Sequence, residues 1–270
     1  MANTIPIEQS LMAEYSIPDG SESLVIQSLF ADPAFTRFYV ENRPRITIPI
    51  YWRVDPSLRP DSYECVHMQE PGVPEYAKIY VPYSPAQVEE ARPIAHELTH
   101  LLLILEGYPG IRGRLPHPIL IRTLGSLLSD AVVDRRLADR YGFNLKADPE
   151  TLTQSVVSKI ERMPLPPRSS LLYASWVLTS ADVILDYETV TQSTTPHPLY
   201  EWLAQRHPRF IKDVNWIMGQ IHSIGYYTPA QQERLLKSII QRLNLAHFGI
   251  YIWDEKQREK ARVACNPALK

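Results

Sequence analysis

The chain has 270 residues, 44% hydrophobic and 21% charged, which are ordinary proportions for a soluble globular protein. Its formal net charge is −2 and its basic residues are scattered, so the sequence predicts neither nucleic acid nor an anionic membrane as a partner. Its two cysteines are too few for a disulfide framework or a cysteine-rich zinc site. The longest apolar run, residues 101–105, is far too short to span a membrane. Residues 1–20 lack the pattern of a secretory signal, so we expect a cytoplasmic protein.

The N-terminal third predicts a helical region followed by a small sheet. Residues 1–40 have a helical pattern in two pieces, interrupted at Asp32-Pro33. Residues 45–54, 63–69 and 76–81 are rich in β-branched and aromatic side chains or alternate in polarity, and proline and glycine separate them. We therefore expect a sheet of about three strands before residue 84.

Helices dominate the rest of the sequence. Residues 84–87 form a capping pattern, and Pro93 predicts a kink or a new helix that ends at Gly107. Further helices are expected at 118–141, from 148 onward, and at 169–187, 199–206, 208–224 and 229–243, with a closing strand at 247–253. The proline-rich residues 164–167 predict a linker between a region at 1–163 and a helical subdomain at 168–270. The fold class expected is α+β, mostly helical.

One pentapeptide has the composition and spacing of a metal site: His96-Glu97-Leu98-Thr99-His100. Residues four apart share one face of a helix, so His96 and His100 present two imidazoles to a common point, as a zinc ion requires. Glu97 lies about 100° around the helix, where a carboxylate can take a proton from a zinc-bound water. A chance match would leave two histidines and a glutamate uncompensated in an apolar helix, which is costly. The pattern therefore predicts zinc.

A catalytic zinc ion needs a third protein ligand, and two candidates soon after the motif fit poorly. Glu106 lies six residues after His100, but Leu103 stands where a turn-forming glycine would be needed, so a continuing helix directs Glu106 away. His117 lies between prolines and is expected at the surface or at a cap.

The helix expected at 118–141 offers a better candidate. Asp134 falls in its apolar stripe and Asp130 lies on the shoulder of that stripe, so both carboxylates face the core and need partners. Zinc and its histidines would provide them. The alternative is that these aspartates pair with nearby arginines such as Arg135, as is common on helices.

The motif, the strand before it and the helix with Asp130-x-x-x-Asp134 resemble the gluzincin group of zinc metallopeptidases, and residues 95–102 look most like the ImmA/IrrE type. The resemblance covers residues 76–143. It implies a zincin-like core at residues 1–163, with the small sheet packed on the motif helix. It implies Asp130 as the third zinc ligand and Asp134 as a group that steadies a ligand histidine. The family usually has glutamate where this chain has aspartate, so the two helices must approach more closely.

These features predict a zinc hydrolase, most simply a metalloprotease that cleaves a peptide or protein with a water activated by Glu97. The strand at residues 76–81 is expected to align an extended peptide along a sheet edge. The alternatives are a non-catalytic metal-binding scaffold or sensor, and a hydrolase of a non-peptide amide. Gluzincins add a Tyr or His near the oxyanion. The sequence selects none of the candidates, and His197, between two prolines, is expected to be solvated surface. The candidates are His197, His207, His222, Tyr226 and Tyr227.

Overall fold

The structure is a computed structural model, and it describes residues 26–58, 63–68, 74–82, 91–113, 118–145, 149–192 and 197–253. Contacts between Cα atoms divide this part of the chain into two compact units. The first comprises residues 26–105 with Arg140–Phe143, and the second comprises Glu106–Asp139 with residues 144–253. The chain is mostly helical with a small sheet, so the predicted α+β class is confirmed.

The first unit contains a three-stranded sheet in the order β1-β3-β2. The central strand β3 (Tyr76–Val81) pairs in parallel with β1 (Ile50–Val54) and antiparallel with β2 (Glu64–Met68). Because β3 is paired on both sides, it has no free edge, and the prediction that residues 76–81 align a peptide along an edge is wrong. The edge strands of the described sheet are β1 and β2.

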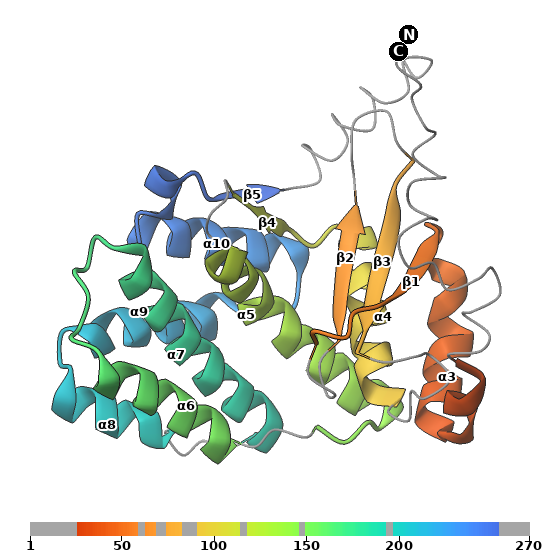
Figure 1. Cartoon of the computed structure of the whole chain (residues 1–270), viewed down its shortest axis with the longest axis horizontal. Coiled ribbons are helices and arrows are strands. Elements are labelled where there is room, and N and C mark those ends of the chain that lie inside the picture. Colours follow the sequence, from red (N-terminus) through yellow and green to blue (C-terminus); the bar gives the residue numbers. More distant parts are fainter. Residues whose placement is uncertain are drawn as a thin grey trace, which may run out of the picture. The chain divides into compact units, whose positions relative to one another are not determined.

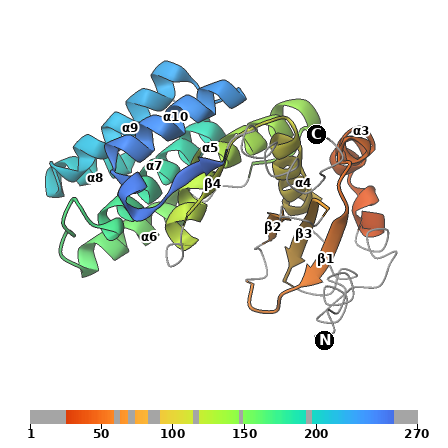
Figure 2. The same ribbon diagram turned by 90° about the horizontal axis from the view of Figure 1, so that it is seen from above.

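Two helices pack beside this sheet, α3 (Pro33–Asn42) and α4 (Ala91–Leu105) (Figures 1 and 2). Helix α4 packs on β2, and α3 packs against α4. Asp32 caps α3 by accepting from the amides of Ala34 and Phe35, and it precedes a proline at the first helical position, which is typical of a helix start. Gly107 has φ +87°, a left-handed conformation that suits glycine, just after α4 ends.

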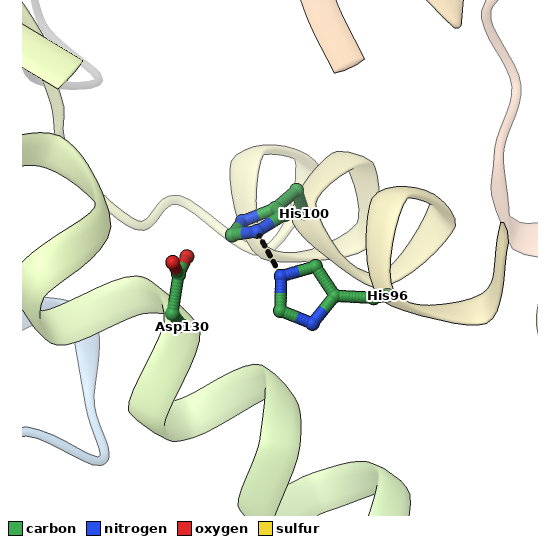
Figure 3. Close-up of side chains that lie close together, drawn as sticks. All are labelled: His96, His100 and Asp130. Atoms are coloured by element: carbon green, nitrogen blue, oxygen red, sulfur yellow. Dashed lines mark hydrogen bonds between the residues drawn. The ribbon is translucent and has the colours of Figure 1, made fainter. Parts of the chain in front are cut away.

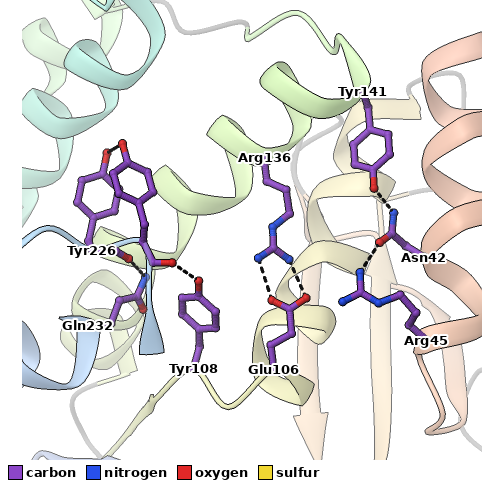
Figure 4. A network of polar contacts seen from close by, with 9 residues as sticks. Asn42, Arg45, Glu106, Tyr108, Arg136, Tyr141, Tyr226 and Gln232 are labelled. Carbon is purple, nitrogen blue, oxygen red and sulfur yellow. Dashed lines mark hydrogen bonds and ion pairs between the residues drawn. The ribbon is translucent and has the colours of Figure 1, made fainter. Parts of the chain in front are cut away.

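A buried asparagine joins α3 to the segment 140–143. Asn42 is 2% exposed and donates to the Tyr141 hydroxyl at 2.6 Å and to the Phe38 carbonyl at 2.9 Å, and its carbonyl accepts from Arg45 at 2.9 Å (Figure 4). A buried amide with all these partners costs little to bury, and it fixes the partners in place.

The second unit is a helical assembly in which α5 (Pro118–Arg136) lies along α7 (Leu171–Thr191). The other helices are α6 (Pro149–Arg162), α8 (Pro198–Arg206), α9 (Phe210–Ile224) and α10 (Pro229–Arg242). Short strands β4 (Gly110–Arg112) and β5 (Tyr251–Trp253) pair antiparallel. Among the described helices, none is at once long enough and apolar enough to cross a membrane.

Most sequence boundaries agree with the structure within a few residues. The Thr228–Gln231 capping box is present, and Gly142 has φ +80° after a π-helical turn, Leu137–Tyr141, that prolongs α5. Strand β1 begins five residues later than predicted: the 3-10 turn Arg43–Arg45 (η2) includes the first predicted residue, and residues 46–49 are irregular. The capping pattern at residues 84–87 lies outside the described residues. The predicted linker, residues 164–167, lies within the second unit and not at the division between the two units.

Candidate metal centre

The motif occupies the least buried face of α4. Core side chains cover the rest of the helix, and they are fully or almost fully buried: Ile94, Ala95, Leu98, Thr99, Leu101, Leu102 and Leu103. His96, Glu97 and His100 are half-buried. Helical periodicity thus places the three chemically active side chains together and leaves them accessible, while the apolar stripe anchors their backbone.

The two imidazoles face each other. The Nε2 atoms of His96 and His100 lie 3.0 Å apart (Figure 3). Two nitrogen ligands at zinc distances of about 2.0–2.1 Å in tetrahedral geometry are roughly 3.3 Å apart. The pair is therefore spaced much as a zinc ion would hold it, and the two rings can also share a hydrogen bond.

Glu97 directly follows His96 on α4, and its charge acts on Cys65 of strand β2. Burial raises the pKa of the Cys65 thiol well above its usual range, and the negative charges of Glu97 and Glu64 add to this effect. Cys65 is opposite Ile79 in the sheet register, and Ile79 is fully buried. Because α4 packs on β2, the charge of Glu97, the residue after His96, is near enough to act on the Cys65 thiol.

Asp130 is half-buried on α5, where the hydroxyl of the preceding Ser129 approaches its Oδ1 atom at 3.4 Å. Its carboxylate completes a group of three potential metal ligands: one ligand atom each of His96, His100 and Asp130 lies within 4.8 Å of the other two (Figure 3). Two imidazole nitrogens and one carboxylate oxygen are a donor set that zinc binds. The residues present therefore fit this ion.

The other candidates have different neighbours. Glu106 accepts two hydrogen bonds from Arg136, at 3.0 and 2.8 Å (Figure 4). Arg135, the arginine named as an alternative partner for Asp130 or Asp134, donates to Asp139 one turn along the helix at 2.7 Å. His117 lies outside the described residues. Asp134 is half-buried on α5 and is not in the three-residue group.

Two further acidic residues lie near Asp130, and the sequence reasoning missed them. Asp182 and Asp186 are one turn apart on α7, which packs along α5. Burial raises the pKa of Asp182 well above its usual range, with the charges of Asp186 and Asp130 acting in the same direction. Like charges four apart on a helix repel, and a proton on Asp182 removes that repulsion. Two carboxylates four residues apart, on either side of the apolar residues 183–185, were the signal available in the sequence.

The candidates for an oxyanion partner have mostly structural contacts. His197 is 1% exposed, so the expectation of a solvated residue is wrong. Its Nδ1 accepts from the Leu199 amide at 3.0 Å, and its Nε2 lies 3.1 Å from the Thr153 hydroxyl, so it caps α8. The Nε2 atom of His222 lies 2.8 Å from the Oε2 atom of Glu188. Tyr226 and Tyr227 stack at 4.4 Å, and the Tyr227 carbonyl accepts from Tyr108 (Figure 4).

Comparison with known proteins adds no assignment. No family model matches the sequence, and no curated protein or solved structure matches it either. The resemblance to gluzincins therefore depends on the motif and on the residues around it.

Proposed function

We propose that the chain is a zinc-dependent hydrolase, most simply a peptidase, with a zincin-like core. The observation that carries the proposal is the 3.0 Å approach of the His96 and His100 Nε2 atoms, with the Asp130 carboxylate in the same group. His96, His100 and Asp130 would hold the ion. Zinc in such a site would act as a Lewis acid and would lower the pKa of a bound water toward about 7.

Glu97 is the proposed general base. It follows His96 directly in the motif and is not part of the ligand group, as a proton acceptor must be. It would accept a proton from the attacking water and deliver it to the leaving amine. Asp134, one turn after Asp130, is proposed to orient a ligand histidine, which fixes the tautomer that binds metal.

Strand β2 is the proposed guide for an extended peptide. It is an edge strand of the described sheet and packs on α4, and its Cys65 approaches Glu97. Main-chain hydrogen bonds to such an edge hold a peptide with little dependence on its sequence. This supports a peptide substrate over a small amide, because β2 packs on the helix that carries the proposed base.

Two histidines and a carboxylate also bind ferrous iron in oxygenases, so the identity of the metal needs a direct measurement. Glu97 favours hydrolysis, because a carboxylate beside the ligand pair serves proton transfer from water. Metal analysis after equilibration with both ions should show zinc, and retention of iron in its place would contradict the proposal.

The Glu97→Gln variant tests the proposed reaction. It should keep the zinc of the wild type and lose roughly 100-fold or more of the rate at which a library of unstructured peptides is cleaved, because a general base contributes about 10²–10⁴. Glu161→Gln is the matched control, since it removes an exposed carboxylate of α6 outside the proposed site and should cleave at the wild-type rate. Full cleavage by Glu97→Gln would contradict the assignment.

A further inference from the structure

A cavity of about 450 Å³ lies within the second unit, where the segment before α7 meets the start of α9 and the end of α10. Its lining carries four positive side chains and one carboxylate: Arg168, Arg209, Lys212 and Arg242 with Asp213. Leu165, Pro166 and Tyr173 complete it. The positive charges exceed the negative by three.

Asp213 holds two of the arginines in fixed positions. It is 1% exposed, and Arg168 donates to both of its oxygens, at 3.0 and 2.8 Å. Arg242 donates through Nε at 3.0 Å, with its Nη2 2.8 Å from the same oxygen. The Tyr173 hydroxyl adds a bond at 2.8 Å. The carboxylate is thus saturated, and each guanidinium is oriented through Nε and Nη2, which leaves Nη1 for a further acceptor.

The other two cations are not explained by this ion-pair network. Arg209 precedes α9 and Lys212 lies in its first turn, and neither has an acidic partner within the described chain. An ion-pair network that only joined α7, α9 and α10 would need no more than Arg168 and Arg242. Four cations around one small cavity repel each other, and a bound anion would offset that repulsion.

The shape and chemistry of the cavity indicate the class of anion. The planar guanidinium group of arginine matches the oxygens of a phosphate group. The guanidinium groups of Arg168 and Arg242 are already oriented by Asp213, so they lose little conformational freedom when a ligand binds. A volume of 450 Å³ equals about fifteen water molecules, within the range of small-molecule sites and larger than a phosphate ion needs. Leu165, Pro166 and Tyr173 give an apolar wall for an organic group.

We propose that this cavity, distinct from the proposed metal centre, binds a phosphate dianion, either free or as the monoester of a small organic molecule. Asp213 acts as a positioning residue, and Arg168, Arg209, Lys212 and Arg242 contact the ligand.

Calorimetric titration of the full chain with inorganic phosphate, phenyl phosphate and phenol tests the proposal. Both phosphates should bind saturably and phenol should not. Tighter binding of phenyl phosphate would identify an ester as the ligand, and equal binding would identify free phosphate. Absence of saturable phosphate binding would overturn the proposal.

Two double variants locate the binding. Arg209→Gln/Lys212→Gln should weaken phosphate binding at least about tenfold, and both side chains are exposed, so folding should be retained. Arg206→Gln/Arg234→Gln removes the same charge from exposed helical positions outside the cavity and should bind as the wild type does. Equal weakening in both would show non-specific attraction, and phosphate held by a metal ion would persist in both. Either result would overturn the site.

Discussion

The Nε2 atoms of His96 and His100 lie 3.0 Å apart on the half-buried face of α4. Seven buried neighbours fix the helix behind them, so the backbone holds both histidines on one face at a constant separation of their Cα atoms. Metal binding would therefore require little rearrangement of this pair, which is the general condition for a tight site.

Asp130→Asn should weaken zinc binding more than Asp134→Asn. Losing a ligand removes a coordinating charge, whereas losing a residue that orients a ligand typically costs about 10–100-fold in affinity. Competition with a chromophoric chelator measures the zinc dissociation constant of each variant. Unchanged affinity in Asp130→Asn would exclude it as a ligand, and a larger loss in Asp134→Asn would exchange the two roles.

Glu106→Gln should leave zinc affinity unchanged, because both Nη atoms of Arg136 donate to the Glu106 carboxylate. The pair is partly exposed, so its loss should cost no more than about 1 kcal/mol of stability. Chelator competition measures the zinc affinity, and urea unfolding measures the free energy of unfolding. A large fall in zinc affinity would make Glu106 the third ligand.

Asp213→Asn should destabilise the protein at neutral pH by about 2 kcal/mol, because charge-assisted bonds from two arginines are lost. Burial acts to raise the pKa of Asp213, but the bonds from Arg168, Tyr173 and Arg242 outweigh it, and the pKa lies below its usual value of 3.8. A depressed pKa stabilises the fold above the unfolded value, and that contribution is lost as pH falls through the folded value. The difference between wild type and variant in urea unfolding should thus shrink below about pH 4. A difference in the free energy of unfolding that stays the same at every pH would contradict the depressed pKa of Asp213.

His197→Asn should remove one source of acid sensitivity. Burial lowers the pKa of His197 below its usual 6.5, so the folded state excludes a proton that the unfolded chain accepts. Stability from this group is full above pH 6.5 and is lost as pH falls through that value toward the folded pKa. Asparagine keeps a good N-cap for α8 without titrating. Unfolding curves on either side of pH 6.5 should show a smaller loss in the variant, and identical losses would refute the explanation.

The order of the strands could not be predicted from the sequence. Local patterns located β1, β2 and β3, because β-branched and aromatic side chains favour strands and polarity alternates along β3. The parallel pairing of β1 with β3 is a contact between distant segments that no local pattern encodes, so the edge was assigned to the wrong strand. The closing strand β5 falls within the predicted residues 247–253, but β4 and its pairing with β5 were missed, because Gly110–Arg112 is too short to show a period and its partner lies far along the chain.

The candidate site was better determined, because its strongest signal is local. Helical spacing alone relates His96, Glu97 and His100. Asp130 required a second inference, from a carboxylate in an apolar stripe, and the same inference would have found Asp182 and Asp186. The ion-pair network at Asp213 could not be foreseen, since its arginines come from separate elements and meet only in the folded unit.

Zinc content after equilibrium dialysis is the most direct test of the central claim. The wild type should retain about one zinc ion per chain, and His96→Gln/His100→Gln should retain almost none. His222→Gln/His247→Gln, which removes two exposed histidines outside the motif, should retain the wild-type amount. A wild type that holds no zinc, or a motif variant that holds as much as the wild type, would contradict the proposed metal centre.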